Sequence, residues 1–527
     1  MKKKVLLLLL AVLCLPLHAM AYSPNQTYTY NIYGEPLALR DAYQVDNIVD
    51  GTKLGITSFN NINSLYVKDN QLFICDSGNN RIVVMNASLK LERVIEGFVR
   101  DGKQEKFNFP TDIATASNGD LYIVDSRNNR IVVLSKDGKF IRLIDHVTSE
   151  MLGANYQFTP TKIVLNSTDN IFVVAKGVNF GIMHIDLNGD VKSFLGAAKV
   201  GFDLMLYLKK QILTKEQAKQ LSRIVPTEYN NIFVDKNNFV YGTINVVDPL
   251  VLYNSINSRL LTVGGVQVNN LNESISAKLL RWISPSASQS GQDDVVKKLN
   301  LKGDDILRRS GYYPVVGDLD FKVKAATRDA KAGPSSFVDI VVDENGIFSV
   351  LDQSRNRIFT YDDNGVLLYA FGGTGRNEGL FDKVSSIERL GDSLLVADSL
   401  RNVVVAYRPT EFAQSIEQGI KAYRDGLYEK SVESWKKSLS LSSNFEIGYI
   451  GVGRALLRLG EYKEAMHYFK IGEYREGYNQ AYEHYRESIL RNVIGYAIVA
   501  LVLLSFLRFL WRRQRKSRLQ MIKNNAG

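Results

Sequence analysis

A segment that recurs along the chain limits the fold more than any other feature of this sequence. Leu72–Val84 returns 49 residues later as Leu121–Val133, with the same order of apolar run, Asp-Ser, Asn-Asn-Arg and second apolar run. Further copies begin at Phe348 and Leu394. A unit repeated at this period does not bury its apolar face alone, so neighbouring copies must pack against one another.

Each copy predicts antiparallel strands. Two apolar runs rich in β-branched residues flank a polar corner, and Asn-Gly or Asp-Gly turn signals lie nearby at Asn118-Gly119, Asp137-Gly138, Asn345-Gly346 and Asn364-Gly365. Four short strands and their turns use about 40 to 50 residues, which is the length of one propeller blade. The repeat therefore predicts an all-β propeller.

These copies resemble the NHL repeat, in which a strand that begins at proline precedes an apolar strand ending in Asp-Ser and an Asn-Arg-Ile corner. Phe109–Ile113 and Phe158–Ile163 match the first part of that pattern. Two weaker blades are predicted from Pro160 to Asp190 and from Pro226 to Gly264. The resemblance implies a six-bladed NHL propeller over residues 22–409. It implies little about activity, because the family includes ligand binders, scaffolds and a few enzymes.

The repeated corner is either a series of ligand sites or a structural device. An Asp that accepts backbone N–H bonds in a tight turn, with Arg packed along the neighbouring blade, explains the repetition without any ligand. We therefore prefer a structural role for the corner residues, which are Asp76, Arg81, Asp125, Arg130, Asp352, Arg357, Asp398 and Arg401.

Two insertions interrupt the predicted propeller. Residues 202–223 have a helical rhythm, and residues 270–331 contain two predicted helices, Ala277–Trp282 and Asp293–Arg309. Long insertions on a rigid scaffold either bind partners or serve as linkers and blade-edge covers. The sequence leaves both alternatives open.

After the last blade the pattern becomes helical and a second repeat begins, with a period of 34 residues. This period resembles the tetratricopeptide repeat. The resemblance implies paired helices within residues 410–490, packed through Gly419, Tyr428 and Trp435 in the first repeat and Gly453, Tyr462 and Phe469 in the second. The next helix carries a tyrosine stripe that is predicted to cap the repeats, although such a stripe also suits sugar binding.

Both ends of the chain predict targeting to a membrane. Lys2–Lys4, the apolar run Val5–Leu15 and Ala19–Ala21 predict a signal peptide over residues 1–21. Residues 492–511 predict a transmembrane helix. The basic residues of the tail, 512–527, predict a cytoplasmic C-terminus. We therefore expect a single-pass protein of the cell membrane with its bulk outside the cytoplasm.

The net charge of +10 does not indicate a nucleic-acid partner. Lys2–Lys4 and the basic residues around the membrane helix account for 11 of the 65 basic residues, so the exported part is about neutral. The two cysteines are Cys14, which lies in the signal peptide, and Cys75. No intramolecular disulfide is therefore expected, and Cys75 is predicted to be a small buried apolar residue.

Motifs for catalysis are weak in this chain. His146 and His184 have no partner at metal-ligand spacing, and neither a nucleophile elbow nor a phosphate loop is present. We therefore predict no catalytic residue, no metal site and no cofactor. Because metal-dependent lactonases share six-bladed propellers, a pore-centred hydrolase or lactonase remains the alternative. Converging carboxylates at the pore would favour that enzyme, and a mixed polar rim would favour binding.

The complete order of segments resembles a group of surface proteins of Gram-positive bacteria, including the opening Tyr28–Pro36. Such proteins are often associated with carbohydrate ABC importers. The resemblance implies an extracytoplasmic scaffold whose partner is a transporter permease, a solute-binding protein or a glycan. A mechanical spacer without a ligand is a third alternative.

The N-terminal segment Thr27–Tyr33 is predicted to close the propeller ring. Its residues have high strand propensity, and Gly34 ends the run. An open ring would expose a sheet edge. We expect this segment to pair as the outer strand of the last blade, beside Val403–Tyr407.

Overall fold

The computed structural model describes residues 26–153, 156–196, 228–244, 294–319 and 334–524. The chain divides into two compact units between Gln414 and Ser415, called here the propeller unit and the helical unit. In the described part of the propeller unit, six sheets of three or more strands form the blades, which confirms the predicted six-bladed β-propeller. A helical segment with one apolar helix follows.

Three blades have the plain four-stranded form. Blade one contains β4 (Ile62–Lys68), β5 (Gln71–Asp76), β6 (Arg81–Met85) and β7 (Leu91–Ile95). Blade two contains β10 (Pro110–Thr115), β11 (Leu121–Asp125), β12 (Arg130–Leu134) and β13 (Phe140–Ile144). Blade three contains β14 (Pro160–Leu165), β15 (Ile171–Ala175), β16 (Ile182–Ile185) and β17 (Val191–Leu195). A hairpin of β8 (Gly97–Arg100) and β9 (Lys103–Lys106) separates the first two blades.

The other three blades combine distant segments. Blade four contains β18 (Tyr229–Val234), β19 (Val240–Ile244) and β20 (Val296–Leu299). Blade five contains β21 (Phe337–Val342), β22 (Phe348–Asp352), β23 (Arg357–Tyr361) and β24 (Leu367–Gly372), with β1 (Tyr28–Tyr30) and β2 (Pro36–Ala38) at its outer edge. Blade six contains β25 (Val384–Leu390), β26 (Ser393–Asp398), β27 (Val403–Pro409) and β3 (Tyr43–Val49).

Apolar residues hold neighbouring blades together. Strands β5 and β6 are buried on both faces, and one of their faces shares a cluster with β11 and β12. Phe73 and Cys75 belong to that cluster together with Ile123 and Val132. Cys75 is fully buried, as predicted, and burial raises the pKa of its thiol well above the ordinary value. A strand sandwiched between two sheets therefore needs apolar residues at nearly every position.

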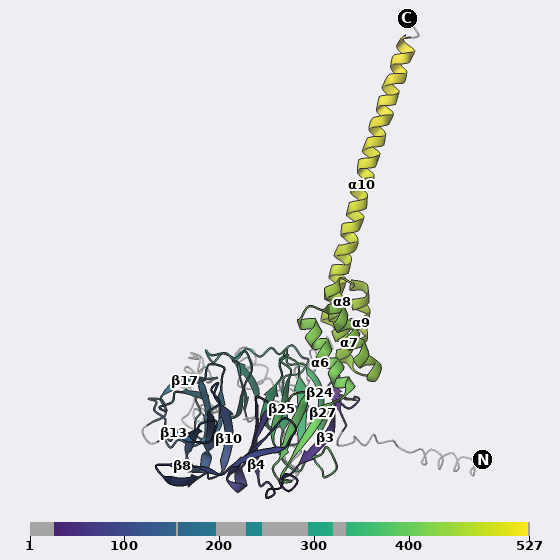
Figure 1. Cartoon of the computed structure of the whole chain (residues 1–527). Coiled ribbons are helices and arrows are strands. Elements are labelled where there is room, and N and C mark those ends of the chain that lie inside the picture. Colours follow the sequence, from purple (N-terminus) through teal and green to yellow (C-terminus); the bar gives the residue numbers. More distant parts are fainter. Residues whose placement is uncertain (1–25, 154–155, 197–227, 245–293, 320–333, 525–527) are drawn as a thin grey trace, which may run out of the picture. The chain divides into compact units, whose positions relative to one another are not determined.

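The ring closes through a different strand from the predicted one. β3 pairs with β27, with Ile48 opposite Val405, and in Figure 1 the purple β3 lies beside the green β27. The predicted segment contributes β1, which pairs with β24 of blade five, where Tyr28 faces Ala370. The expected pairing with Val403–Tyr407 was therefore wrong. The longer seven-residue β3 takes that edge, and the three-residue β1 extends the neighbouring blade.

The predicted helix Asp293–Arg309 was also wrong. Residues Val296–Leu299 form β20, which pairs antiparallel with β19. Pairing with β19 decides the structure of these residues, although their sequence has a helical periodicity. The other predicted insertion helices, within 202–223 and at Ala277–Trp282, lie outside the described residues.

Five helices form the rest of the described chain, with their bounds at α6 (Glu411–Arg424), α7 (Tyr428–Leu441), α8 (Glu446–Leu459), α9 (Tyr462–Ile471) and α10 (Arg475–Asn524). α10 is drawn as one continuous helix in Figure 1. It contains an apolar stretch long enough to cross a membrane, and none of that stretch is buried by the rest of the described chain. This exposure is what a bilayer-spanning helix requires.

Candidate functional site

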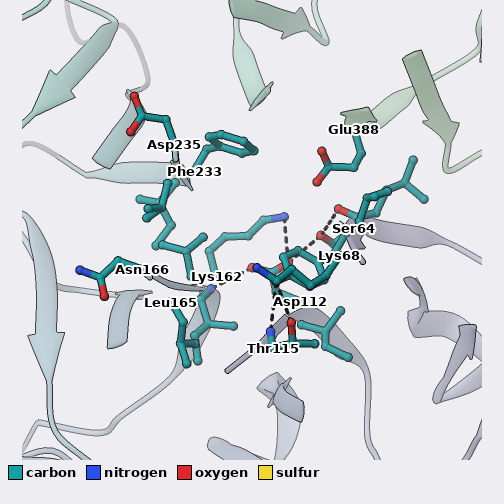
Figure 2. Close-up of a pocket in the computed structure, with 18 of the residues that line it drawn as sticks. Ser64, Lys68, Asp112, Thr115, Lys162, Leu165, Asn166, Phe233, Asp235 and Glu388 are labelled. Atoms are coloured by element: carbon teal, nitrogen blue, oxygen red, sulfur yellow. Dashed lines mark hydrogen bonds and ion pairs between the residues drawn. The ribbon is translucent and has the colours of Figure 1, made fainter. Parts of the chain in front are cut away.

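A cavity of about 520 Å³ lies at the centre of the propeller. It is lined by the first strand of every blade, namely β4, β10, β14, β18, β21 and β25. Figure 2 shows polar side chains from several of these strands pointing into this space. Because six strands converge here, one residue position repeated in each blade produces a ring of side chains.

The first strand of every blade has a register irregularity near its start. A bulge of this kind turns the next side chain to a new direction. The residue after the irregularity is polar and buried in all six blades. These six residues, which we call the inner ring, are Ser64, Asp112, Lys162, Asn231, Asp339 and Ser386.

Hydrogen bonds connect the inner ring around Asp112. The hydroxyl of Ser64 donates to Asp112 Oδ1 at 2.6 Å. The backbone N–H of Ile163 donates to Asp112 Oδ2 at 2.8 Å. This carboxylate therefore links blades one, two and three, and both of its oxygens accept a hydrogen bond.

Asp339 plays the same part across the ring. Its Oδ1 accepts from the side-chain amide of Asn231, and its Oδ2 accepts from the hydroxyl of Ser386 at 2.5 Å and from the backbone of Ile387 at 2.8 Å. Ser386 in turn accepts from the N–H of Leu65 at 2.9 Å. Burial raises the pKa of Asp339, and the charge of Lys162 opposes that rise.

Lys162 is the cationic member of the inner ring and lines the cavity. Its residue is 92% buried, since the exposed fraction is 8%, yet its nearest carboxylate oxygen is Asp112 Oδ1 at 3.9 Å, which is too long for a hydrogen bond. Burial acts to lower its pKa, but the charges of Asp112 and Asp339 outweigh burial, and the pKa is raised. The ammonium is therefore charged and keeps donors for a ligand.

Glu388 faces the same space from another side (Figure 2). Burial raises the pKa of its carboxyl group to about 8, despite a 2.9 Å hydrogen bond from the backbone of Arg389. With this pKa the group is mostly protonated at neutral pH, so it can donate a hydrogen bond to a ligand. The cavity thus combines a cation, a neutral acid and two saturated carboxylates.

The mouth of the cavity has charges of both signs. Lys68 ends strand β4, and the turns after the first strands carry Asp69, Asp169, Asp235 and Lys236. Two aromatic side chains, Tyr66 and Phe233, line the wall below. The Tyr66 hydroxyl is paired with Thr115 at 3.1 Å, so its ring is fixed in place.

The predicted corner residues lie elsewhere, and none of the eight lines this cavity. Asp76 and Asp125 are fully buried. Each accepts a 2.7 Å bond from the backbone of the preceding loop. Each is also bonded to the Nε of its own arginine, Arg81 at 2.7 Å and Arg130 at 2.8 Å. In these corners the arginine therefore neutralises its own aspartate.

The later corners differ in their arginines. Asp352 accepts from the N–H of Ser336 at 2.9 Å, and Asp398 accepts from the N–H of Asp382 at 2.7 Å. Arg357 pairs with Asp318 at 3.0 Å, and Arg401 donates to the carbonyl of Leu380 at 2.7 Å. All eight residues thus make contacts that support a structural role.

Four of the six predicted packing residues of the helical unit contact one another in pairs. A Cβ on Gly419 would lie 3.0 Å from the ring of Trp435, and one on Gly453 would lie 2.6 Å from Phe469. The ring of Tyr428 contacts Tyr423 edge to face. Tyr462 stacks on His484. These close approaches support the predicted packing of helix pairs.

The sequence analysis missed the inner ring. Its signal was a polar residue two positions after the start of each first strand, as in Pro110-Thr-Asp112 and Pro160-Thr-Lys162. Its members vary from Ser to Asp to Lys, so the position is visible only after the blades are aligned. Among the described residues, no group of three or more His, Cys, Asp or Glu side chains has the geometry of a metal site.

Comparison with known proteins concerns the propeller. Residues 107–134 match the NHL repeat family. No curated protein matches the chain significantly. Among solved structures, virginiamycin B lyase from Staphylococcus aureus is 12% identical, covering 69% of this chain and 99% of its own with a TM-score of 0.37. A streptogramin B lyase is 10% identical, covering 70% and 100%, with a TM-score of 0.36. The β-propeller domain of Myceliophteria thermophila Cps50 (Swd1) is 8% identical, covering 70% and 100%, with a TM-score of 0.35.

Proposed function

We propose that this protein is a membrane-anchored extracytoplasmic binding scaffold whose propeller cavity holds a polyhydroxylated ligand, such as the end of a glycan. The observation that carries this proposal is Lys162, a largely buried residue that lines the cavity and whose ammonium has no hydrogen bond to the described residues. The ammonium opens onto the cavity, so an acceptor of a bound ligand can reach it and form a charge-assisted hydrogen bond.

The chemistry of the cavity suits hydroxyl groups. Lys162 and protonated Glu388 would donate, while the carboxylates at the mouth of the cavity would accept, so a ligand needs both kinds of partner. The volume of about 520 Å³ lies within the usual range for small-molecule sites. Tyr66 and Phe233 add apolar wall area, and aromatic faces suit the C–H side of a sugar ring.

The alternative is a pore-centred hydrolase or lactonase. Its supporting observation is Glu388, because a carboxyl group with a pKa of about 8 is suited to general acid chemistry. A metal-dependent form is less favoured, since the Lys162 ammonium lies beside Asp112 and would repel a divalent cation there. Glu388→Gln separates the candidates: it would abolish hydrolysis but leave most of the binding.

The helical unit supports a membrane location for this scaffold. The apolar part of α10 would anchor the chain, and a signal peptide at residues 1–21 would export the propeller. Tetratricopeptide-like pairing of α6 to α9 would present a docking face to a transporter permease or a solute-binding protein. An accessory role for a carbohydrate importer fits a glycan ligand in the cavity.

The test uses the full chain in nanodiscs. A glycan array identifies ligands, and calorimetry then compares wild type with Lys162→Met and with Lys176→Met, an exposed lysine just after the second strand of the same blade. Loss of a charge-assisted hydrogen bond should weaken binding roughly 10- to 100-fold in Lys162→Met. Lys176→Met should bind like wild type. Absence of any glycan ligand, or full binding by a folded Lys162→Met protein, would disprove the proposal.

A further inference from the structure

The helical unit contains a second, smaller cavity of about 200 Å³. It is formed by residues of α6, α8 and α9 and by the first turns of α10, all within that unit. Its walls carry three tyrosines and two arginines, and no Asp or Glu belongs to its described lining. The cavity therefore has a different chemistry from the mixed charges of the propeller.

Two arginines give this cavity its charge. Arg454 and Arg458 are four residues apart on α8 and so lie one turn apart on the same face. Neither makes an ion pair with a carboxylate of the described residues. Arg424 of α6, by contrast, lies 3.7 Å from Asp425. Both guanidinium groups line one cavity, and an anion bound there would interact favourably with both positive charges.

Aromatic contacts hold both arginines in place. The guanidinium of Arg454 lies over the Tyr474 ring, 5.4 Å from its centre. The Nε of Arg458 donates to the Tyr423 hydroxyl at 3.3 Å. Neither contact uses all five guanidinium donors. Both arginines therefore keep donors for a ligand, Arg454 from a partly buried position and Arg458 from an exposed one.

The floor of the cavity is also fixed. Phe469 is 1% exposed and is held between two glycines. A Cβ on Gly453 would lie 2.6 Å from its ring, and one on Gly477 would lie 2.8 Å from it. Larger residues at either position would displace this ring, so the shape of the cavity depends on close packing.

We propose that this cavity binds one oxyanion group, a carboxylate or a phosphate, through Arg454 and Arg458. Planar guanidinium forks match the two oxygens of such groups. A volume of about 200 Å³ admits one such group and is below the usual range for larger ligands.

The position along α10 indicates where this anion comes from. His484 also lines the cavity and precedes Asn492 by eight residues, so it lies about 12 Å from the apolar stretch at 1.5 Å per residue. The headgroup layer extends only roughly 5 to 7 Å beyond the hydrocarbon. In a chain anchored by α10, the cavity therefore lies beyond the lipid phosphates, and we assign it to a soluble anion.

The experiment places the full chain in nanodiscs of phosphatidylcholine and titrates inorganic phosphate and succinate by calorimetry. We expect saturable binding of at least one of them. Arg454→Gln and Arg458→Gln should each weaken it by about tenfold or more, because each removes a charged fork while keeping a good helix former. Arg486→Gln, an exposed α10 residue outside the lining, is the matched control.

Circular dichroism and the melting temperature show whether each variant is folded. If phosphatidylglycerol in the nanodiscs competes with phosphate, the site is still an oxyanion site, but a lipid supplies the anion. The proposal is overturned if neither anion binds at millimolar concentration, or if the folded arginine variants bind as well as the Arg486→Gln control.

Discussion

Two buried carboxyl groups of the propeller, those of Asp125 and Glu388, lie in different surroundings. Asp125 is buried at a blade corner, where backbone and arginine donors satisfy it. Glu388 is buried at the cavity, and burial raises the pKa of its carboxyl group to about 8. The two carboxyl groups thus differ in their partners, because Asp125 accepts from a backbone N–H and from an arginine, whereas Glu388 accepts from the backbone N–H of Arg389 without a cation beside it among the described residues.

At this scale the corner can be tested with Asp125→Ala. Removing the carboxylate leaves the N–H of Asn108 and the Nε of Arg130 without their acceptor. The free energy of unfolding should fall by about 1–3 kcal/mol, measured by denaturant titration, and ligand binding should change only in proportion. Asp137→Ala, at an exposed turn of the same blade, should be nearly neutral. A variant that kept its stability and lost its ligand would show that the corner is a binding site.

A second residue-scale prediction concerns pH. The Glu388 carboxyl titrates at about 8 in the folded protein and at about 4.5 when unfolded, so the folded state binds the proton more tightly. The stabilisation present below pH 4.5 is therefore lost as pH rises from about 4.5 to about 8. Over this interval the free energy of unfolding of the wild type should fall by about 2–4 kcal/mol more than that of Glu388→Gln.

The pH test depends on a difference between two proteins, because Asp339 and Asp352 also have raised pKa values from burial. Those two groups are present in both proteins and cancel. Parallel stability curves for wild type and Glu388→Gln would mean that Glu388 is already ionised in the folded protein at neutral pH.

Among the elements, β3 has the greatest effect on ring closure. It joins the start of the propeller to β27 at its end, and Val49 is buried in the cluster shared by blades six and one. Strand β1 only adds to β24, the outer strand of a blade that is already complete. In the described part of the chain, blades one to three have no such extra strand.

Two deletions distinguish these strands. Removing residues 26–38 should leave a monomer of somewhat lower stability, because blade five then resembles blades one to three. Removing residues 26–49 should expose the edge of β27 and cause self-association, since unpaired edges bind other strands. Light scattering of the detergent-solubilised proteins measures the difference. A monomeric, equally stable product of the longer deletion would contradict the role of β3.

At the scale of the whole molecule, the basic residues after α10's apolar part predict its orientation in a membrane. The apolar part of α10 is followed at once by Arg512, Arg513, Arg515 and Lys516, and no acidic residue separates them. Basic residues next to a membrane helix remain on the cytoplasmic side. The propeller would then lie outside, where a glycan or an exported partner is available.

Protease added to cells with permeable walls tests this orientation. The propeller should be digested, and a small fragment around residues 493–527 should survive, as detected with an antibody against the C-terminal tail. A tagged cytoplasmic protein in the same cells is the control for lysis. Protection of the propeller would reverse the proposed topology.

The sequence predicted the parts of this protein that depend on local pattern. The repeated apolar runs around Asp76 and Asp125 are sufficient to predict blades, because alternation and turn residues act within a few positions. The apolar stretch of α10 was visible for the same reason. Even the weak blade at Pro160 was found, since its first two strands keep the pattern.

Tertiary structure decided which segments meet. Thr27–Tyr33 and Tyr43–Val49 are both suited to strands, and only the geometry of the closing ring selects the second for β27. The strand β20 was hidden because its partner β19 lies more than 50 residues earlier in the chain. Lys162 looks like an ordinary strand lysine in the sequence. It becomes a cavity residue because six bulged strands converge on one axis, and that convergence is a property of the closed ring and of no single blade.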